Sequence, residues 1–303
     1  MTPLSFCAIA VCIAAVSVAG ARALQPGRVG GIVTAGLMTL TPLLWLQARS
    51  APVSLAPLPF VAGWLWAMSH YELHRGTWWP ALAGAFLGIG VYTSYPSVVM
   101  MPLFLLLTIA VAAHTRALPW RAMVLMVAVF AVAVSPIAVS LVRQPDLFRN
   151  TVNAFHLYDA DRFNLRQGVR EMASWVGLTA RTEVYYDYFN PAFLFLTGRV
   201  LLFPLAVLLP AGVFQIVSHE TTLLARLSMA GFFAAPFAAS LTAQPPTPRR
   251  ILFLTPFAAL VAAYGVKWLL SVTGRYSRFG LRIADKPISY AAESARSARS
   301  RRP

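Results

Sequence analysis

The sequence predicts an all-α, polytopic membrane protein with about nine transmembrane helices and one long external loop. Of its 303 residues, 58% are hydrophobic and only 12% are charged, which is about half the charged fraction of a typical soluble domain. The mean hydropathy is +0.65. Apolar runs close to twenty residues long recur along the chain, and each such run can cross about 30 Å of hydrocarbon.

Apolar windows bounded by helix-breaking residues place the spans at 4–20, 30–46, 53–69, 79–94, 96–113, 121–142, 200–217, 226–242 and 251–270. The first run is followed by small residues, as in a signal peptide, but it lacks a positively charged leading region. We therefore expect a first transmembrane helix there. The fourth and fifth runs meet at Pro96, which breaks the helix, and Tyr92 and Tyr95 beside it are typical of a membrane interface.

Basic residues predict which side of the membrane each loop occupies. The short loops on the side of the C-terminal tail hold six arginines: Arg22, Arg28, Arg75, Arg116, Arg121 and Arg226. The short loops on the other side hold three: Arg49, Arg249 and Arg250. The tail from Lys267 onward adds nine more basic residues. This excess predicts a cytoplasmic C-terminus with a basic tail at 271–303, and a transmembrane domain at 1–270 whose external loop covers about 143–199.

The formal net charge of +15 does not indicate nucleic acid as a partner. The basic residues are concentrated in short segments between apolar runs and in the tail, and no separate basic, aromatic domain exists to bind nucleic acid. The lipid bilayer is the expected partner, and multi-pass insertion in a bacterial cytoplasmic membrane is the expected localisation.

The external loop carries most of the acidic residues. Asp159 and Asp161, one residue apart, are compatible with a divalent cation, with a general base, or with an ordinary solvated loop. The segment 165–176 has the periodicity of a short amphipathic helix. No zinc-ligand spacing, phosphate-binding glycine loop or nucleophile elbow occurs in the sequence. We expect no cofactor, unless a divalent cation binds here.

Three arginines of the predicted outer side are candidate ligands for phosphate. Arg249 and Arg250 end the stretch "QPPTPRR", whose prolines force an extended approach to the last span. Arg49 lies in the outer loop after the second span. Arginine binds phosphate with a bidentate fork, and it also anchors helices at a membrane interface. Both interpretations fit all three residues.

Several stretches together resemble a known family. "TLTPLLWLQARSAPVSLAPLPFVAGWLW", the glycine-rich "WWPALAGAFLGIGVYTSYPSVVMMPLFLLL", the outer-loop "YFNPAFLFLTG" and "PTPRRILFLTPFAALVAAYGV" occur in this order. The order resembles membrane glycosyltransferases of the GT-C fold, in particular the family 39-like group related to protein mannosyltransferases and aminoarabinose transferase. The resemblance covers roughly residues 30–270.

The resemblance implies transfer of a hexose or pentose from a polyprenyl-phosphate donor to a glycan, lipid or protein acceptor on the outer face. It implies that Arg249, Arg250 and Arg49 contact the donor phosphate, and that Tyr188, Phe189 and Asp187 line the substrate cleft. The family carries its catalytic acid in the first outer loop, whereas the segment after the first run here, "ARALQPGRVG", has no acid. The catalytic residue is therefore unknown, and we expect an N-terminally truncated or an inactive homologue.

Two other functions stay open from the sequence. A non-catalytic membrane partner or assembly protein is the first alternative, and a transporter of lipid-linked sugars is the second. The transporter is disfavoured because no acid lies in the core of a predicted span.

Overall fold

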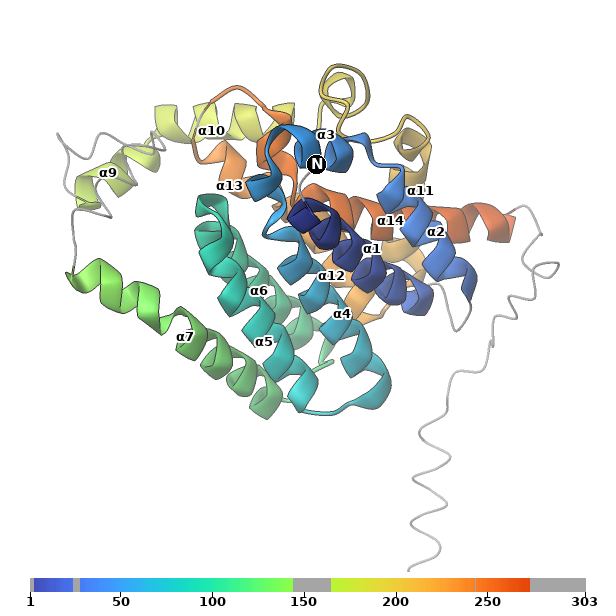
Figure 1. Ribbon diagram of the computed structural model, residues 1–303, viewed down its shortest axis with the longest axis horizontal. Coiled ribbons are helices and arrows are strands. Elements are labelled where there is room, and N and C mark those ends of the chain that lie inside the picture. Colours follow the sequence, from blue (N-terminus) through green and yellow to red (C-terminus); the bar gives the residue numbers. More distant parts are fainter. Residues whose placement is uncertain (1–2, 24–27, 144–164, 243, 273–303) are drawn as a thin grey trace, which may run out of the picture.

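The computed structural model describes residues 3–23, 28–143, 165–242 and 244–272. These residues form helices, and no strand occurs among them, which confirms the predicted all-α fold. Figure 1 shows a bundle of packed helices with α9 and α10 across one end. The α-helices are α1 (Pro3–Ala23), α2 (Arg28–Thr39), α3 (Pro42–Ser50), α4 (Leu58–His74), α5 (Trp78–Gly90), α6 (Tyr95–Thr115), α7 (Trp120–Arg143), α9 (Leu165–Met172), α10 (Trp175–Asp187), α11 (Leu205–His219), α12 (Leu223–Ala234), α13 (Phe237–Ser240) and α14 (Leu254–Val272). Shorter turns are η1 (Pro52–Leu55), η2 (Val91–Thr93), the π-helical η3 (Ala192–Thr197) and η4 (Pro248–Ile251).

Several helices could cross a membrane. Four helical segments of the described residues are long and apolar enough: Tyr95–Thr115, Trp120–Ile137, Leu223–Ser240 and Leu254–Val272. A fifth span results if Val29–Thr39 and Pro42–Ser50, which bend by 47° at their break, cross together. Membrane character is thus supported, but nine spans are not shown.

Two of the remaining predicted spans, 79–94 and 200–217, coincide with helices that are shorter than expected. Helix α5 ends at Gly90 and gives way to the tighter η2 turn, and α11 begins only after Pro204. Gly90 favours the turn that ends α5. Pro204 has no backbone N–H to donate within a helix, so it stands at the start of α11 rather than in its interior.

Three connections meet at one end of the bundle. Helices α4 and α6 end at Arg75 and Arg116, both with a left-handed φ of 51°. The Arg75 guanidinium then donates a hydrogen bond of 2.9 Å to the carbonyl of Ala117. At the same end, the Glu72 carboxylate accepts a hydrogen bond of 3.1 Å from the backbone N–H of Leu224, in the first turn of α12. Three of the connections predicted to share one side of the membrane therefore lie together, and which side this is stays a prediction.

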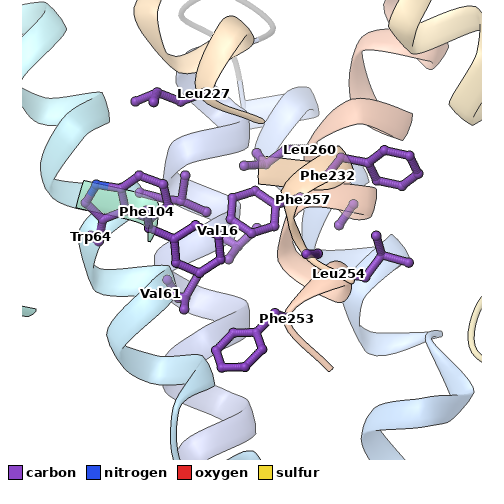
Figure 2. Packing of buried hydrophobic residues seen from close by; sticks show 14 of the residues in the cluster. Val16, Val61, Trp64, Phe104, Leu227, Phe232, Phe253, Leu254, Phe257 and Leu260 are labelled. Atoms are coloured by element: carbon purple, nitrogen blue, oxygen red, sulfur yellow. The ribbon is translucent and has the colours of Figure 1, made fainter. Parts of the chain in front are cut away.

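Helix α14 forms the centre of the core. Its residues from Leu254 to Gly265 are all buried, and Figure 2 shows the ring of Phe257 among the other buried side chains of this core. Trp64 of α4 stacks on Phe104 of α6, with ring centroids 5.3 Å apart, and Phe257 of α14 lies 5.3 Å from Phe104. A helical segment that is buried on all sides is expected to carry no charge, and the buried part of α14, from Leu254 to Gly265, carries none.

Glycines allow two helix pairs to approach closely. A Cβ atom on Gly212 of α11 would meet the carbonyl oxygen of Val261, and one on Gly265 of α14 would meet that of Leu208. Gly84 of α5 likewise faces the carbonyl oxygen of Met126 in α7. Small residues at crossings of this kind are common between membrane helices, because they let the backbones pack directly.

The described part of the segment predicted as a long external loop, from 165 to 199, contains α9, α10 and the π-helical η3. The expected amphipathic helix over 165–176 is confirmed for its first part as α9, but it breaks at 173–174. Ser174 starts a new helix, since its hydroxyl accepts a hydrogen bond of 3.1 Å from the N–H of Gly177. Asp159, Asp161 and the tail from 273 lie outside the described residues.

Candidate functional site

A cavity of about 430 Å³ lies between α10 and α13. Figure 1 shows these two helices at the end of the bundle opposite the α4–α5 connection. We call it the α10–α13 cavity. It is lined by Ala173, Leu178, Arg181, Thr182, Tyr185, Tyr186, Phe237, Ser240 and Leu241. The lining combines tyrosines and one arginine with apolar side chains. Such a mixture suits a ligand that has both an apolar part and a polar, anionic part.

One face of α10 supplies the cavity wall. Leu178, Arg181, Thr182 and Tyr185 follow each other at intervals of three, one and three residues, and this spacing places them on one side of a helix. Tyr186 extends the wall and keeps 67% of its surface exposed. This face therefore presents two phenol rings and a guanidinium to the same space.

Arg181 holds the two sides of the cavity together. Its Nε donates a hydrogen bond of 3.0 Å to the carbonyl of Leu241, and its Nη1 donates one of 2.9 Å to the carbonyl of Gly177. Burial lowers the pKa of Arg181, and the negative charge of Glu171 opposes this change. The side chain stays cationic, because arginine has an ordinary pKa far above neutrality. It thus fixes α10 to the segment after α13 and contributes positive charge.

Tyr185 is held by a similar link. Its hydroxyl donates a hydrogen bond of 2.8 Å to the carbonyl of Phe233, at the C-terminal part of α12. Burial is the main cause that raises the pKa of this phenol, followed by the neighbouring Tyr186. The ring is therefore a neutral, positioned wall of the cavity.

Two of the predicted site residues, Tyr188 and Arg250, are brought together by the segment before α14. The backbone N–H of Thr247 donates a hydrogen bond of 3.3 Å to the hydroxyl of Tyr188, which is fully buried. Burial raises the pKa of Tyr188, while the Thr247 N–H and the charge of Arg250 oppose the rise. This grouping joins the two stretches "YYDYFNP" and "PTPRR", which are some sixty residues apart in sequence.

Arg250 binds its own chain segment. Its Nη1 donates a hydrogen bond of 2.7 Å to the hydroxyl of Thr242, and its Nη2 donates one to the side-chain oxygen of Gln244. Arg181 and Arg250 therefore hold adjacent residues, Leu241 and Thr242, at the edge of the cavity. The predicted contact of Arg250 with a donor phosphate stays a prediction.

The other predicted residues occupy different surroundings. Phe189 packs against aromatic rings of α12, with centroids 5.6 Å from Phe232 and 5.8 Å from Phe233, and it does not line the cavity. Asp187, at the end of α10, is exposed, and so are Arg49 in the last turn of α3 and Arg249 in η4. Of these, Arg249 lies on an element next to the cavity, because η4 packs against α13.

Sequence reasoning missed the residues that line the cavity. Arg181, Tyr185 and Tyr186 all fall within the predicted external loop at about 143–199, where the sequence analysis names no cavity. The helical spacing from Leu178 to Tyr185 was the signal that could have found them. It is weak, because charged and aromatic residues alternate on both faces of this helix.

The described residues contain no group of three or more His, Cys, Asp or Glu side chains placed to hold a metal ion. At the far end of the bundle, Glu72 of "HYELH" acts as a cap for α12, and His70 stacks on Trp79 with ring centroids 4.3 Å apart. The polar residues of this motif therefore serve helix packing.

Comparison of the chain with protein-family models, with curated proteins and with solved structures gives no match. The resemblance to the GT-C family stays a prediction.

Proposed function

We propose that this chain is a GT-C-like membrane glycosyltransferase homologue that binds a polyprenyl-phosphate-linked sugar in the α10–α13 cavity. In this proposal it crosses a bacterial cytoplasmic membrane about nine times, with its C-terminus in the cytoplasm and the cavity on the outer face. The acceptor would be a glycan, lipid or protein reached from that face.

The lining of the cavity is the observation that carries the proposal. A volume of about 430 Å³ falls within the ordinary range of about 300–1,000 Å³ for small-molecule sites. Tyr185 and Tyr186 offer flat amphipathic surfaces against which a sugar ring can pack, with hydroxyl groups at their edges. Leu178, Phe237 and Leu241 offer apolar contacts for the first isoprene units.

Cations at the edge of the cavity support binding of the phosphate. Arg181 lines the cavity directly, and exposed Arg249 lies on η4, which packs against α13. Two guanidinium groups on different elements can neutralise a phosphodiester and later the departing lipid phosphate. Of the three arginines predicted from the sequence, Arg249 is therefore the strongest candidate ligand.

A non-catalytic role in binding the same lipid is the second candidate. Transfer of a sugar requires a group that deprotonates or orients the acceptor hydroxyl. The described residues that line the cavity include no carboxylate, and the nearby Glu183 and Asp187 are exposed on α10. This observation favours a partner protein that presents the donor.

A binding and turnover assay separates these functions. The purified full chain in lipid nanodiscs would be titrated with a polyprenyl-phosphate hexose, with the same polyprenyl phosphate lacking sugar, and with the uncharged polyprenol. We expect saturable binding of the first, weaker binding of the second and the weakest binding of the third. Equal affinity for the phosphate and the polyprenol would contradict the proposal. Release of polyprenyl phosphate on addition of acceptor would identify an enzyme, whereas binding without release would identify the partner.

A further inference from the structure

A second cavity, of about 420 Å³, lies between α6, α11 and α12, away from the α10–α13 cavity. We call it the α6–α12 groove. It is lined by Ala110, Val111, His114, Ile216, Val217, Arg226, Met229 and Ala230. Six of these eight side chains are apolar, and the other two are basic.

The two basic side chains lie at the same end of the groove. His114 is in the last turn of α6, and Arg226 is in the first turns of α12. These two helices pack against each other, and their ends meet near the Glu72–Leu224 hydrogen bond. The apolar lining residues of α6 and α12 lie one helical turn further toward the middle of the bundle. The groove thus has a positively charged end and an apolar body.

The neighbouring helices indicate how the groove lies relative to the membrane. Tyr95–Thr115 and Leu223–Ser240 are two of the four segments that can span a membrane. A groove between them therefore faces the hydrocarbon, with its basic end at the level of the lipid headgroups. Exposed Ala110 and Val217 on its walls leave the apolar body open to the side.

We propose that the α6–α12 groove binds a membrane phospholipid with an anionic headgroup. One acyl chain lies along the apolar walls, and the phosphate contacts Arg226 and His114. Charge complementarity selects an anionic lipid, because the groove offers two basic groups at one end and arginine binds phosphate through a planar pair of donors. The apolar body favours a lipid over a water-soluble phosphate, because a soluble phosphate would bury none of the apolar surface of the wall.

Native mass spectrometry of the full chain, titrated with dioleoyl phosphatidylglycerol or dioleoyl phosphatidylcholine, tests this site. We expect the anionic lipid to bind about tenfold more tightly than the zwitterionic one, and Arg226→Gln to remove most of this preference. Arg121→Gln is the matched control, since Arg121 is an exposed arginine on α7 that does not line the groove. It should leave both affinities unchanged.

Ala110→Phe tests the apolar part without altering charge. The larger ring fills the groove from an exposed position, so both lipids should bind more weakly while the melting temperature stays the same. Ala110→Phe also tests whether lipid occupies the groove if Arg226→Gln is poorly folded. The proposal is overturned if Arg226→Gln folds and keeps the preference for phosphatidylglycerol, or if Ala110→Phe leaves lipid binding unchanged. Displacement of the lipid by an equal concentration of glycerol 3-phosphate would also overturn it, because the site would then recognise a soluble phosphate.

Discussion

Replacement of Gly212 by alanine tests the close crossing of α11 and α14. The added Cβ atom would meet the carbonyl oxygen of Val261, and it would lie 2.8 Å from the carbonyl carbon of that residue and 3.1 Å from the backbone nitrogen of Gly265. All three atoms belong to the backbone of α14, so no side chain can rotate away to make room. Helices α11 and α14 must separate, and α14 is the central helix of the core.

The expected magnitude follows from two opposing effects. Overpacking of a tightly packed core costs about 1–3 kcal/mol, and the rigidity of the backbone places this site in the upper part of that range. The change from glycine to alanine inside a helix contributes about 1 kcal/mol of stabilisation. We therefore expect Gly212→Ala to lower the free energy of unfolding by about 1–2 kcal/mol.

Gly36→Ala is the matched control, because a Cβ atom there would meet no atom within 4 Å. It receives the same gain in helix propensity without the steric cost, so the two variants should differ by about 2–3 kcal/mol. Equilibrium unfolding in mixed micelles, with increasing fractions of sodium dodecyl sulfate and circular dichroism as the signal, measures this difference. The reasoning is refuted if Gly212→Ala is as stable as Gly36→Ala.

Two further predictions concern the polar contacts at each end of the bundle. Arg250→Ala removes the hydrogen bonds to Thr242 and Gln244, so amide hydrogen exchange in 244–250 should become about tenfold faster. Arg249→Ala is the control and should leave this exchange unchanged. Equal exchange in both variants would show that Arg250 does not hold this segment. Glu72→Gln weakens the cap on α12 and should lower the free energy of unfolding by about 1 kcal/mol. Chemical denaturation measures this change, and unchanged stability would show that the contact does not stabilise the fold.

The positions of the helices could largely be predicted from sequence. The runs 96–113 and 121–142 fall within α6 and α7, since apolar length and breaker residues are local properties of the chain. The number of spans could not be predicted in the same way. Whether a helix such as α5 continues through Gly90 depends on packing as well as composition, and the structure ends it there.

None of the residues predicted for the site lines the α10–α13 cavity. The structure does bring Tyr188 close to the segment that carries Arg250, but their role in a site stays a prediction. The cavity itself could not be predicted, because it depends on how α10 packs against α13, and residues of these helices are some sixty positions apart. The hydrogen bond of Glu72 to Leu224 is equally non-local, as it joins residues 152 positions apart.

The affinity of the Tyr186→Ala variant for a polyprenyl-phosphate hexose tests the central claim most directly. Tyr186 lines the α10–α13 cavity and is largely exposed, so its truncation should leave the fold intact. Tyr95→Ala is the control, because Tyr95 is similarly exposed but lies outside the cavity. We expect Tyr186→Ala to bind about tenfold more weakly than the wild type and Tyr95→Ala to bind equally well. Equal affinity of all three proteins would contradict the assignment of this cavity to the lipid-linked sugar.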